Sequence, residues 1–276
     1  MPPPGSGILL DPGTLTLWML FQRFATAGIR TLVQWSAQDG LAFPAEHPAH
    51  QHAVPTIIAC LAGSIQVDGR RRLDLLPGDL LLIEPGCWHH QHRTRPGSSG
   101  FGIGFIAGWC DVVFFDSAEK RWGKVREQPY RGLADALMDE PLAAERLRLA
   151  DEILAGLTSE RIDVLDWIEP AVMAMAEYLW RHLHLRLDVD AMLAASRLRR
   201  TAGYRLFKEF FHRSPKQELI GQRLALARHL LGRGFAPADA ARRSGFAKCA
   251  EMARSLRAHL GLGLADLPAA SGRPTA

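Results

Sequence analysis

The sequence predicts an α+β protein of several domains: a β-barrel or jelly roll first, a helical connector next and an all-α domain last. Three observations predict this order. The chain has 276 residues, more than the roughly 100–200 of one ordinary domain. Its apolar pattern changes near Leu133 from short runs between turns to a helical period. Its charge also divides, because residues 186–276 hold 17 Lys and Arg against 7 Asp and Glu, whereas residues 1–185 hold 16 against 22. Such a basic module indicates nucleic-acid binding, with a solvated basic face as the alternative.

The β part is predicted from short apolar runs separated by turn residues. The runs are TLVQW (31–35), TIIACL (56–61), SIQVDG (64–69), RLDLLPGDLLLIEPG (72–86) and GIGFIAG (102–108). Val-Asp-Gly and Leu-Pro-Gly-Asp mark tight turns, because Gly tolerates positive φ and Pro presets φ. Strands at this spacing, with no 3.6-residue period between them, favour a small barrel or jelly roll.

Histidines gather in the β part. Six of the 11 lie close together in sequence, at His47, His50, His52, His89, His90 and His92. On a strand, the period-2 spacing of His50 and His52 places both imidazoles on one face. His89 from a later strand would complete a metal site with three nitrogen ligands and one open coordination position.

AHQH (49–52), GSIQV (63–67) and PGDLLLIEPGCWH (77–89) resemble the two sequence motifs of the cupin superfamily, which implies a cupin-like barrel. The acidic ligand that this family places shortly after the second histidine is absent here, since residues 53–56 read AVPT. We therefore expect no cofactor and no divalent metal, but a small-molecule effector pocket. Its expected lining is His50, His52, His89, Trp35 and Trp88. A metal site at the three histidines and purely structural histidines are the alternatives.

The connector and the start of the last domain show helical periods. Leu147, Ala150, Leu154 and Leu157 recur at three- or four-residue steps, as do Ile168, Val172, Met175 and Leu179. These periods predict amphipathic helices over 142–157 and 163–184.

Residues 186–231 predict a helix-turn-helix. Asp190, or a residue just before it, caps a first helix that buries Met192 and Leu193. After a turn near Arg197, a second helix begins around Arg200 and packs Leu206, Phe207 and Phe210 inward. Its polar side carries Arg199, Arg200, Thr201, Tyr204, Arg205 and Lys208. Arg can donate two hydrogen bonds to one guanine in the major groove, whereas Lys208 is suited to a phosphate contact.

The same pattern then repeats about 49 residues later. ADAARRSGF (238–246) parallels DAMLAASRL (190–198), and MARSLRAHLG (252–261) parallels YRLFKEFFHR (204–213). Two such units joined by a long helix would reach major-groove segments about 34 Å apart. A solvated basic face does not predict repetition.

Residues 170–267 resemble the double helix-turn-helix DNA-binding domain of AraC/XylS transcriptional regulators. The resemblance rests on RLFK (205–208), Ser214-Pro215 followed by RLALARHLL (223–231), Ser-Gly-Phe (244–246) and MARSLR (252–257). It implies base contacts from Arg200, Thr201 and Arg205 in the first unit. In the second unit it implies DNA contacts from Lys248, Cys249, Ala250, Arg254 and Arg257. It also implies that one connector helix mediates dimerisation; alternatively, these helices only cover the neighbouring domains.

Departures from the family pattern occur in both units and fall mostly in the second. A bulky apolar residue is expected at Gly203 in the first unit, and aromatic residues at Met252 and Leu256 in the second. Glu251 would repel phosphate, and Leu264-Ala265 replaces the Ser-Pro of the family. We therefore expect specificity to rest mainly on the first unit.

The expected domains are 1–13, a flexible N-terminus; 14–132, a cupin-like effector-binding and dimerisation domain; 133–169, the helical connector; 170–268, the AraC-type DNA-binding domain; and 269–276, a flexible tail. The function we expect is that of a sequence-specific DNA-binding transcription regulator, an activator rather than a repressor, and not an enzyme. Its expected partners are double-stranded DNA, a small-molecule effector, RNA polymerase and a second copy of the chain. The alternative is a cupin-type metalloenzyme that uses His50, His52 and His89.

The sequence also predicts a cytoplasmic location. Its 47% hydrophobic residues exclude disorder, and the densest apolar stretch, residues 15–21, is far shorter than the roughly 18 residues of a membrane span. MPPPGSGILL does not read as a secretory signal. Cys60, Cys87, Cys110 and Cys249 form no CxxC pair and read as reduced thiols.

Overall fold

The computed structural model describes residues 12–37, 49–92, 95–106, 109–118, 120–126, 130–159, 163–165 and 170–267. The chain divides into two units. The β unit comprises Met1–Trp35, Pro55–Glu84 and Gln91–Ile168, and the helical unit comprises Ser36–Val54, Pro85–His90 and Glu169–Ala276. A β-rich N-terminal part and a helical C-terminal part confirm the predicted α+β class. The expected N-terminal segment 1–13 and tail 269–276 lie almost wholly outside the described residues.

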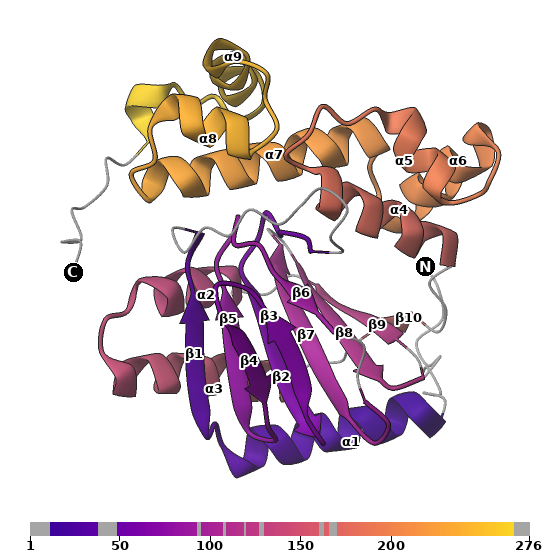
Figure 1. Ribbon diagram of the computed structural model, residues 1–276, viewed down its shortest axis with the longest axis vertical. Helices are drawn as coiled ribbons and strands as arrows, with labels where there is room; N and C mark the ends of the chain where they lie inside the picture. The colour runs from indigo at the N-terminus through magenta and orange to yellow at the C-terminus, as the bar shows by residue number, and fades with distance from the viewer. Residues whose placement is uncertain are drawn as a thin grey trace, which may run out of the picture. The chain divides into compact units, whose positions relative to one another are not determined.

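The strands of the described residues form two sheets (Figure 1). They are β1 (Thr31–Trp35), β2 (Thr56–Ala62), β3 (Ile65–Asp68), β4 (Arg72–Leu75), β5 (Asp79–Ile83), β6 (His90–Gln91), β7 (Ser99–Ile106), β8 (Trp109–Asp116), β9 (Lys120–Arg126) and β10 (Asp163–Leu165). The seven-stranded sheet has the order β1-β5-β2-β7-β8-β9-β10, and the three-stranded sheet has the order β4-β3-β6. The β1–β5 pair is parallel, and every other neighbouring pair described in the larger sheet is antiparallel.

The five apolar runs of the sequence all fall on strands. The long run 72–86 divides into β4 and β5 at Gly78, whose φ of 93° supports the predicted turn. Asp79, the first residue of β5, accepts hydrogen bonds from Arg30, just before β1, with Arg30 Nε 2.9 Å from Asp79 Oδ1. This ion pair fixes the register at which the two parallel strands begin.

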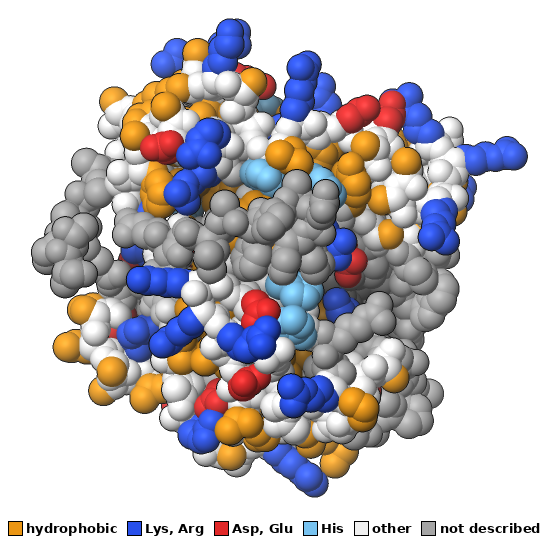
Figure 2. All heavy atoms as spheres, in the orientation of Figure 1, with side chains coloured by type: hydrophobic (Ala, Val, Ile, Leu, Met, Phe, Trp, Pro, Cys, Tyr) orange, Lys and Arg blue, Asp and Glu red, His pale blue; other side chains and the backbone are white. Residues whose placement is uncertain are grey.

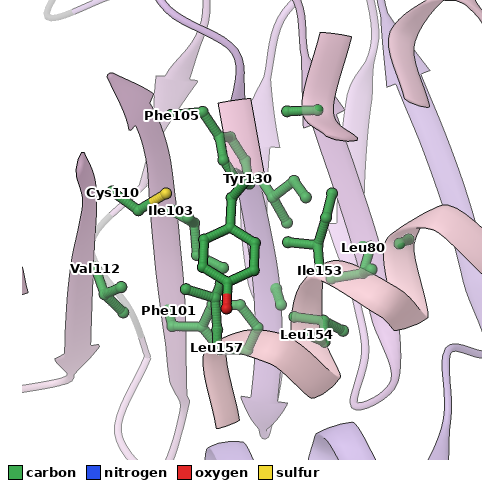
Figure 3. Close-up of a cluster of buried hydrophobic side chains, with 14 of the residues drawn as sticks. Leu80, Phe101, Ile103, Phe105, Cys110, Val112, Tyr130, Ile153, Leu154 and Leu157 are labelled. Atoms are coloured by element: carbon green, nitrogen blue, oxygen red, sulfur yellow. The ribbon is translucent and has the colours of Figure 1, made fainter. Parts of the chain in front are cut away.

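Three helices cover one face of the larger sheet: α1 (Pro12–Ala27), α2 (Tyr130–Asp139) and α3 (Ala143–Ser159). Side chains two residues apart on β7 point to the same face, and they meet the helices there (Figure 3). The strands contribute Leu80, Phe101, Ile103, Phe105, Cys110 and Val112, and the helices contribute Tyr130, Ile153, Leu154 and Leu157. This buried cluster is the core of the β unit.

Helix α1 was not predicted. It begins at Pro12, two residues before the expected boundary of the barrel domain. Its Leu17, Phe21 and Phe24 are buried and recur at four- and three-residue steps, so they share one face. The rings of Phe21 and Phe101 pack edge to face, with their centroids 4.8 Å apart.

The connector prediction is partly wrong. The first predicted helix, 142–157, is α3, but residues 163–165 form β10, which pairs with β9. The second predicted helix is therefore shorter, α4 (Pro170–His182). Val164 and Leu165 are apolar enough to fit a strand or a helix, and pairing with an available sheet edge decides between them.

The helical unit continues with five helices. They are α5 (Val189–Ala195), α6 (Arg200–Phe211), α7 (Pro215–Gly232), α8 (Pro237–Arg243) and α9 (Cys249–Leu260). α6 begins at the predicted residue. α7 begins at the predicted Ser-Pro break, where Ser214 and Gln217 form a reciprocal capping box. Among the described residues, none of the helices combines the length and apolar character of a bilayer span.

Candidate nucleic-acid interface and histidine cluster

Two helix pairs of the helical unit have the same construction. α5 and α8 have 7 residues each, and α6 and α9 have 12 residues each. Each short helix ends in a serine, Ser196 or Ser244, and each long helix ends in a left-handed residue, His212 or Gly261. The sequence repeat thus corresponds to two copies of one helix-turn-helix.

Buried serines shape both turns. Ser196 Oγ donates to Leu193 O at 2.5 Å and accepts from Leu198 N at 3.2 Å. Ser244 Oγ donates to Ala240 O at 2.5 Å. A hydroxyl that satisfies the last carbonyls of a short helix lets the chain leave the helix without buried unpaired groups. The cap of α5, predicted at Asp190 or just before it, is Asp188, whose side chain accepts from Asp190 N.

The two long helices bury one side and expose the other. α6 buries Phe207 and Phe211, and α9 buries Met252 and Leu256. Leu206 and Phe210, which we expected to be buried, are half-buried. The predicted DNA contacts lie outside these buried faces: Arg199, Arg200, Thr201, Arg205, Lys208, Lys248, Ala250, Arg254 and Arg257 are exposed, and Tyr204 and Cys249 are half-buried.

Surface ion pairs hold two of the exposed arginines. Arg200 Nε lies 2.7 Å from Asp190 Oδ1, and Arg205 Nε lies 3.7 Å from Glu209 Oε1. The two arginine side chains are 70% and 77% exposed. Exposed pairs of this kind contribute roughly 0–1 kcal/mol, so both guanidinium groups can exchange their carboxylates for another anion or a base edge. Figure 2 shows Lys and Arg side chains standing out from the surface of the helical unit.

Two of the departures from the family pattern, at Gly203 and Glu251, have a local structural reason. A Cβ on Gly203 would lie 3.3 Å from Leu193 Cδ2 and 3.4 Å from Ser196 Oγ, so α6 lies close against α5 and no bulky residue fits there. Glu251 Oε2 accepts from Ala247 N at 3.1 Å. Its carboxylate thus serves the turn before α9.

Arg223 in α7 joins the segment between α4 and α5 to the turn of the second motif, a role that no sequence pattern indicated. Its Nε donates to Leu183 O at 3.1 Å, and its Nη2 donates to Leu185 O. Leu183 O and the Arg223 guanidinium also lie against Gly245 in the second turn. α7 itself has 18 residues, and at 1.5 Å per residue it is about 27 Å long. It contacts α6 on one side and α8 and α9 on the other.

The helical unit also contains the histidine cluster, formed by His50, His52 and His89. His50 and His89 exchange two backbone hydrogen bonds of 2.9 Å, so their side chains lie on the same face. The ring centroids are 4.4 Å apart for His50–His89, 4.8 Å for His50–His52 and 5.1 Å for His52–His89. One ring nitrogen from each histidine lies within 4.8 Å of the others.

The environment of the cluster favours the neutral form of two of its imidazoles, those of His52 and His89. His89 Nδ1 lies 3.1 Å from the carbonyl oxygen of Cys87, and because a carbonyl only accepts, Nδ1 carries the proton and Nε2 the lone pair. Burial is the main cause that lowers the pKa of His89 to about 4. Burial, and secondly repulsion from the protonated form of His89, hold the pKa of His52 well below its ordinary value.

Trp180 of α4 contacts the cluster, and His184, just after α4, contacts Trp88 next to His89; we predicted neither contact. The Trp180 ring meets His52 at 5.3 Å, and the His184 ring meets Trp88 at 4.7 Å. His182 and His184 have the same spacing as His50 and His52, and this was the sequence feature that could have indicated a contact. Trp35 lies in the β unit, where its ring covers Gly69. His92 is also there, with Nε2 2.6 Å from Asp68 Oδ2, and His47 lies outside the described residues.

No protein-family model and no curated protein matches the chain. Among solved structures, the chain resembles the DNA-binding domain of AdpA in complex with a target DNA, with 27% identity over 34% of this chain and 86% of that one (TM-score 0.33). It resembles an AraC-type transcriptional regulator from Chromobacterium violaceum with 19% identity over 36% of this chain and 88% of that one (TM-score 0.33). It resembles ToxT from Vibrio cholerae with 8% identity over 79% of this chain and 93% of that one (TM-score 0.36). Of these similar structures, AdpA is a global transcriptional factor and the Chromobacterium violaceum protein is an AraC-type transcriptional regulator.

Proposed function

We propose that the chain is a sequence-specific, DNA-binding transcription regulator. The observation that carries this proposal is the duplicated helix-turn-helix, whose two long helices expose Arg and Lys on the face opposite their buried side chains. A basic exposed helix in this motif has the dimensions and the donors to enter a major groove. The two motifs flank a helix about 27 Å long, comparable to the ~34 Å between successive major-groove segments on one face of DNA.

Base reading is assigned mainly to the first motif. Arg200 and Thr201 begin α6, and Arg205 follows about one turn later on the exposed side. Guanidinium groups there are able to reach guanine O6 and N7. In the second motif, Lys248 caps α9, and the small residues Cys249 and Ala250 allow its N-terminus to approach DNA closely. Arg254 and Arg257 stand on the exposed side further along.

The remaining elements of the proposal concern control. We propose activation rather than repression, regulation by a small ligand bound at the N-terminal part of the chain, contact with RNA polymerase and action as a homodimer. No catalytic role is proposed. A ligand controls DNA binding only if it interacts differently with two arrangements of the protein.

Selection of bound duplexes from a random pool by the full chain tests the function. We expect one recurring motif, bound much more tightly than unrelated DNA, with an affinity that falls steeply as salt rises because phosphates are neutralised. Arg200→Ala should weaken binding to the motif. Arg148→Ala is the matched control, because Arg148 is an exposed arginine of α3 that also pairs with carboxylates. Equal affinity for all sequences would contradict the proposal.

A further inference from the structure

The tip of the β3–β4 hairpin carries the only run of three consecutive basic residues in the sequence, Arg70, Arg71 and Arg72, here called the arginine tip. All three residues are exposed. They stand out because residues 1–185 hold 22 acidic residues against 16 basic ones. A polyanion repels an acidic surface and attracts a compact basic one. The arginine tip is therefore a place where the β unit can face a polyanion.

Packing holds the arginine tip in one position. The Trp35 ring lies directly against Gly69, where an added Cβ would be 2.5 Å from Trp35 Cζ3. Trp35 itself is only 3% exposed, so the turn rests on a buried side chain. Gly69 N also donates to Arg71 O at 3.3 Å and closes the turn. A tip that is already ordered loses little conformational entropy when it binds a partner.

A carboxylate ties the base of the hairpin together. Asp68 on β3 accepts a hydrogen bond from Arg72 Nε on β4 at 2.9 Å, and its other oxygen lies 2.6 Å from His92 Nε2, just after β6. All three strands of the smaller sheet meet at this carboxylate (Figure 1). Arg71 stands in the turn between β3 and β4, and within the described part of the chain it forms no ion pair. Arg72 thus anchors the hairpin, and the turn can receive an external anion.

The chemistry of the arginine tip fits phosphate. A guanidinium group presents a planar set of donors that matches two phosphate oxygens, and contacts of this kind carry no base information. The proposed function supplies the phosphates. Once the two helix-turn-helix motifs hold their site, the DNA on either side is present to the rest of the chain at a high effective concentration. An acidic protein segment would have to be recruited separately, so we favour DNA.

We propose that Arg70 and Arg71 contact phosphates of the duplex that flanks the sequence bound by the two motifs. The inference rests on the proposed function and extends it, because the β unit then takes a direct part in DNA binding. Its contribution is independent of sequence: it raises the affinity for DNA without changing the preferred motif.

Two duplexes test the proposal with the full chain. One holds the selected motif alone, and the other extends it by about two helical turns (~20 bp) of unrelated sequence on each side. The wild type should bind the longer duplex more tightly, with a salt slope steeper by about 1.8 for two neutralised phosphates. This advantage should fall about 12-fold between 50 and 200 mM salt. Equal affinities and slopes for the two duplexes would overturn the proposal without any variant.

The double variant Arg70→Ala, Arg71→Ala should lose this advantage and bind the short duplex like the wild type. The matched control is Arg23→Ala, Arg148→Ala, which removes two exposed arginines from α1 and α3 of the same unit and should keep the advantage. Equal losses in both double variants would reduce the effect to net charge and contradict a contact at the tip.

The remaining outcomes separate this inference from the proposed function. If the wild type selects no motif, the proposed function fails, and the inference fails with it. If the wild type binds its motif specifically but the Arg70→Ala, Arg71→Ala variant keeps the advantage of the longer duplex, only the inference fails. The arginine tip would then be assigned to an acidic protein segment instead of DNA.

Discussion

Arg223 Nε donates a hydrogen bond to the carbonyl oxygen of Leu183, and the two groups together occupy the space next to Gly245. Leu183 follows α4, Arg223 lies in α7, and Gly245 forms the turn between α8 and α9. This contact joins the support of the first motif, the linking helix and the second motif. It therefore links the segments that adjoin both helix-turn-helix motifs.

Gly245→Ala should destabilise the helical unit. Gly245 has φ +81°, and an added Cβ would overlap Leu183 O. We expect a loss of roughly 1–2 kcal/mol for the left-handed backbone and roughly 1–3 kcal/mol more for the overlap. Gly261→Ala is the control, because Gly261 has φ +67° but open space around it. Urea unfolding of both variants measures the difference, and equal losses would show that the overlap contributes nothing.

Arg205→Ala and Lys208→Ala should affect DNA binding differently. If Arg205 reads a base, its loss costs about 1–3 kcal/mol and relaxes specificity at one position. If Lys208 meets a phosphate, its loss weakens binding to all sequences alike and reduces the salt slope by about 1. Affinities for the selected motif and for single-base variants at several salt concentrations separate the two. Wild-type affinity in Arg205→Ala would contradict the assignment.

Cys249 should be the reactive thiol of the native chain, and DNA should protect it. Burial is the main cause that raises the pKa of Cys60 to about 11 and of Cys110 to about 12, so both remain protonated thiols at pH 8. Cys87 is buried, whereas Cys249 is half-buried at the start of α9. Alkylation followed by mass spectrometry should label Cys249 first, and more slowly with the selected duplex. Protection absent at saturating DNA would place α9 away from the interface.

Gly203→Leu should be destabilising, although the family pattern places a bulky apolar residue there. The space is filled by Leu193 and Ser196, with Met175 of α4 close behind. Overpacking of a fitted core costs typically about 1–3 kcal/mol. Gly132→Leu is the matched control, because nothing lies within 4 Å of a Cβ on this exposed glycine of α2. Thermal unfolding of both variants tests this, and an unchanged or raised melting temperature for Gly203→Leu would contradict the packing.

Protonation of Asp68 should make the β unit less stable at low pH. The pKa of Asp68 is lowered from 3.8 to about 2. The hydrogen bond from Arg72 is the largest cause of this shift, burial opposes it, and the hydrogen bond from His92 adds to it. Because the folded pKa lies below the unfolded one, the contribution is present above about pH 4 and is lost as pH falls towards 2. The difference in unfolding free energy between wild type and Asp68→Asn should therefore shrink over that range. A difference that stays constant from pH 5 to pH 2 would exclude this linkage.

Local patterns account for what the sequence predicted correctly. Strands follow from apolar runs between turn residues, and Ser214-Pro215 marks a helix start through capping and the limits on proline. α1 was missed although Leu17, Phe21 and Phe24 have helical spacing, because this stretch was taken as part of the β region. β10 was missed because three residues beside a helical period carry no distinct pattern.

The sequence by itself determined the duplicated helix-turn-helix, its exposed arginines and the common face of His50 and His52, because periods and repeats are local properties of the chain. Only the tertiary structure decided that Trp180 packs on His52, that Arg223 holds Leu183 and that Gly203 has no space for a larger residue. These contacts join segments about 10 to 130 residues apart. Such contacts depend on how whole elements pack, and no single element's pattern encodes them.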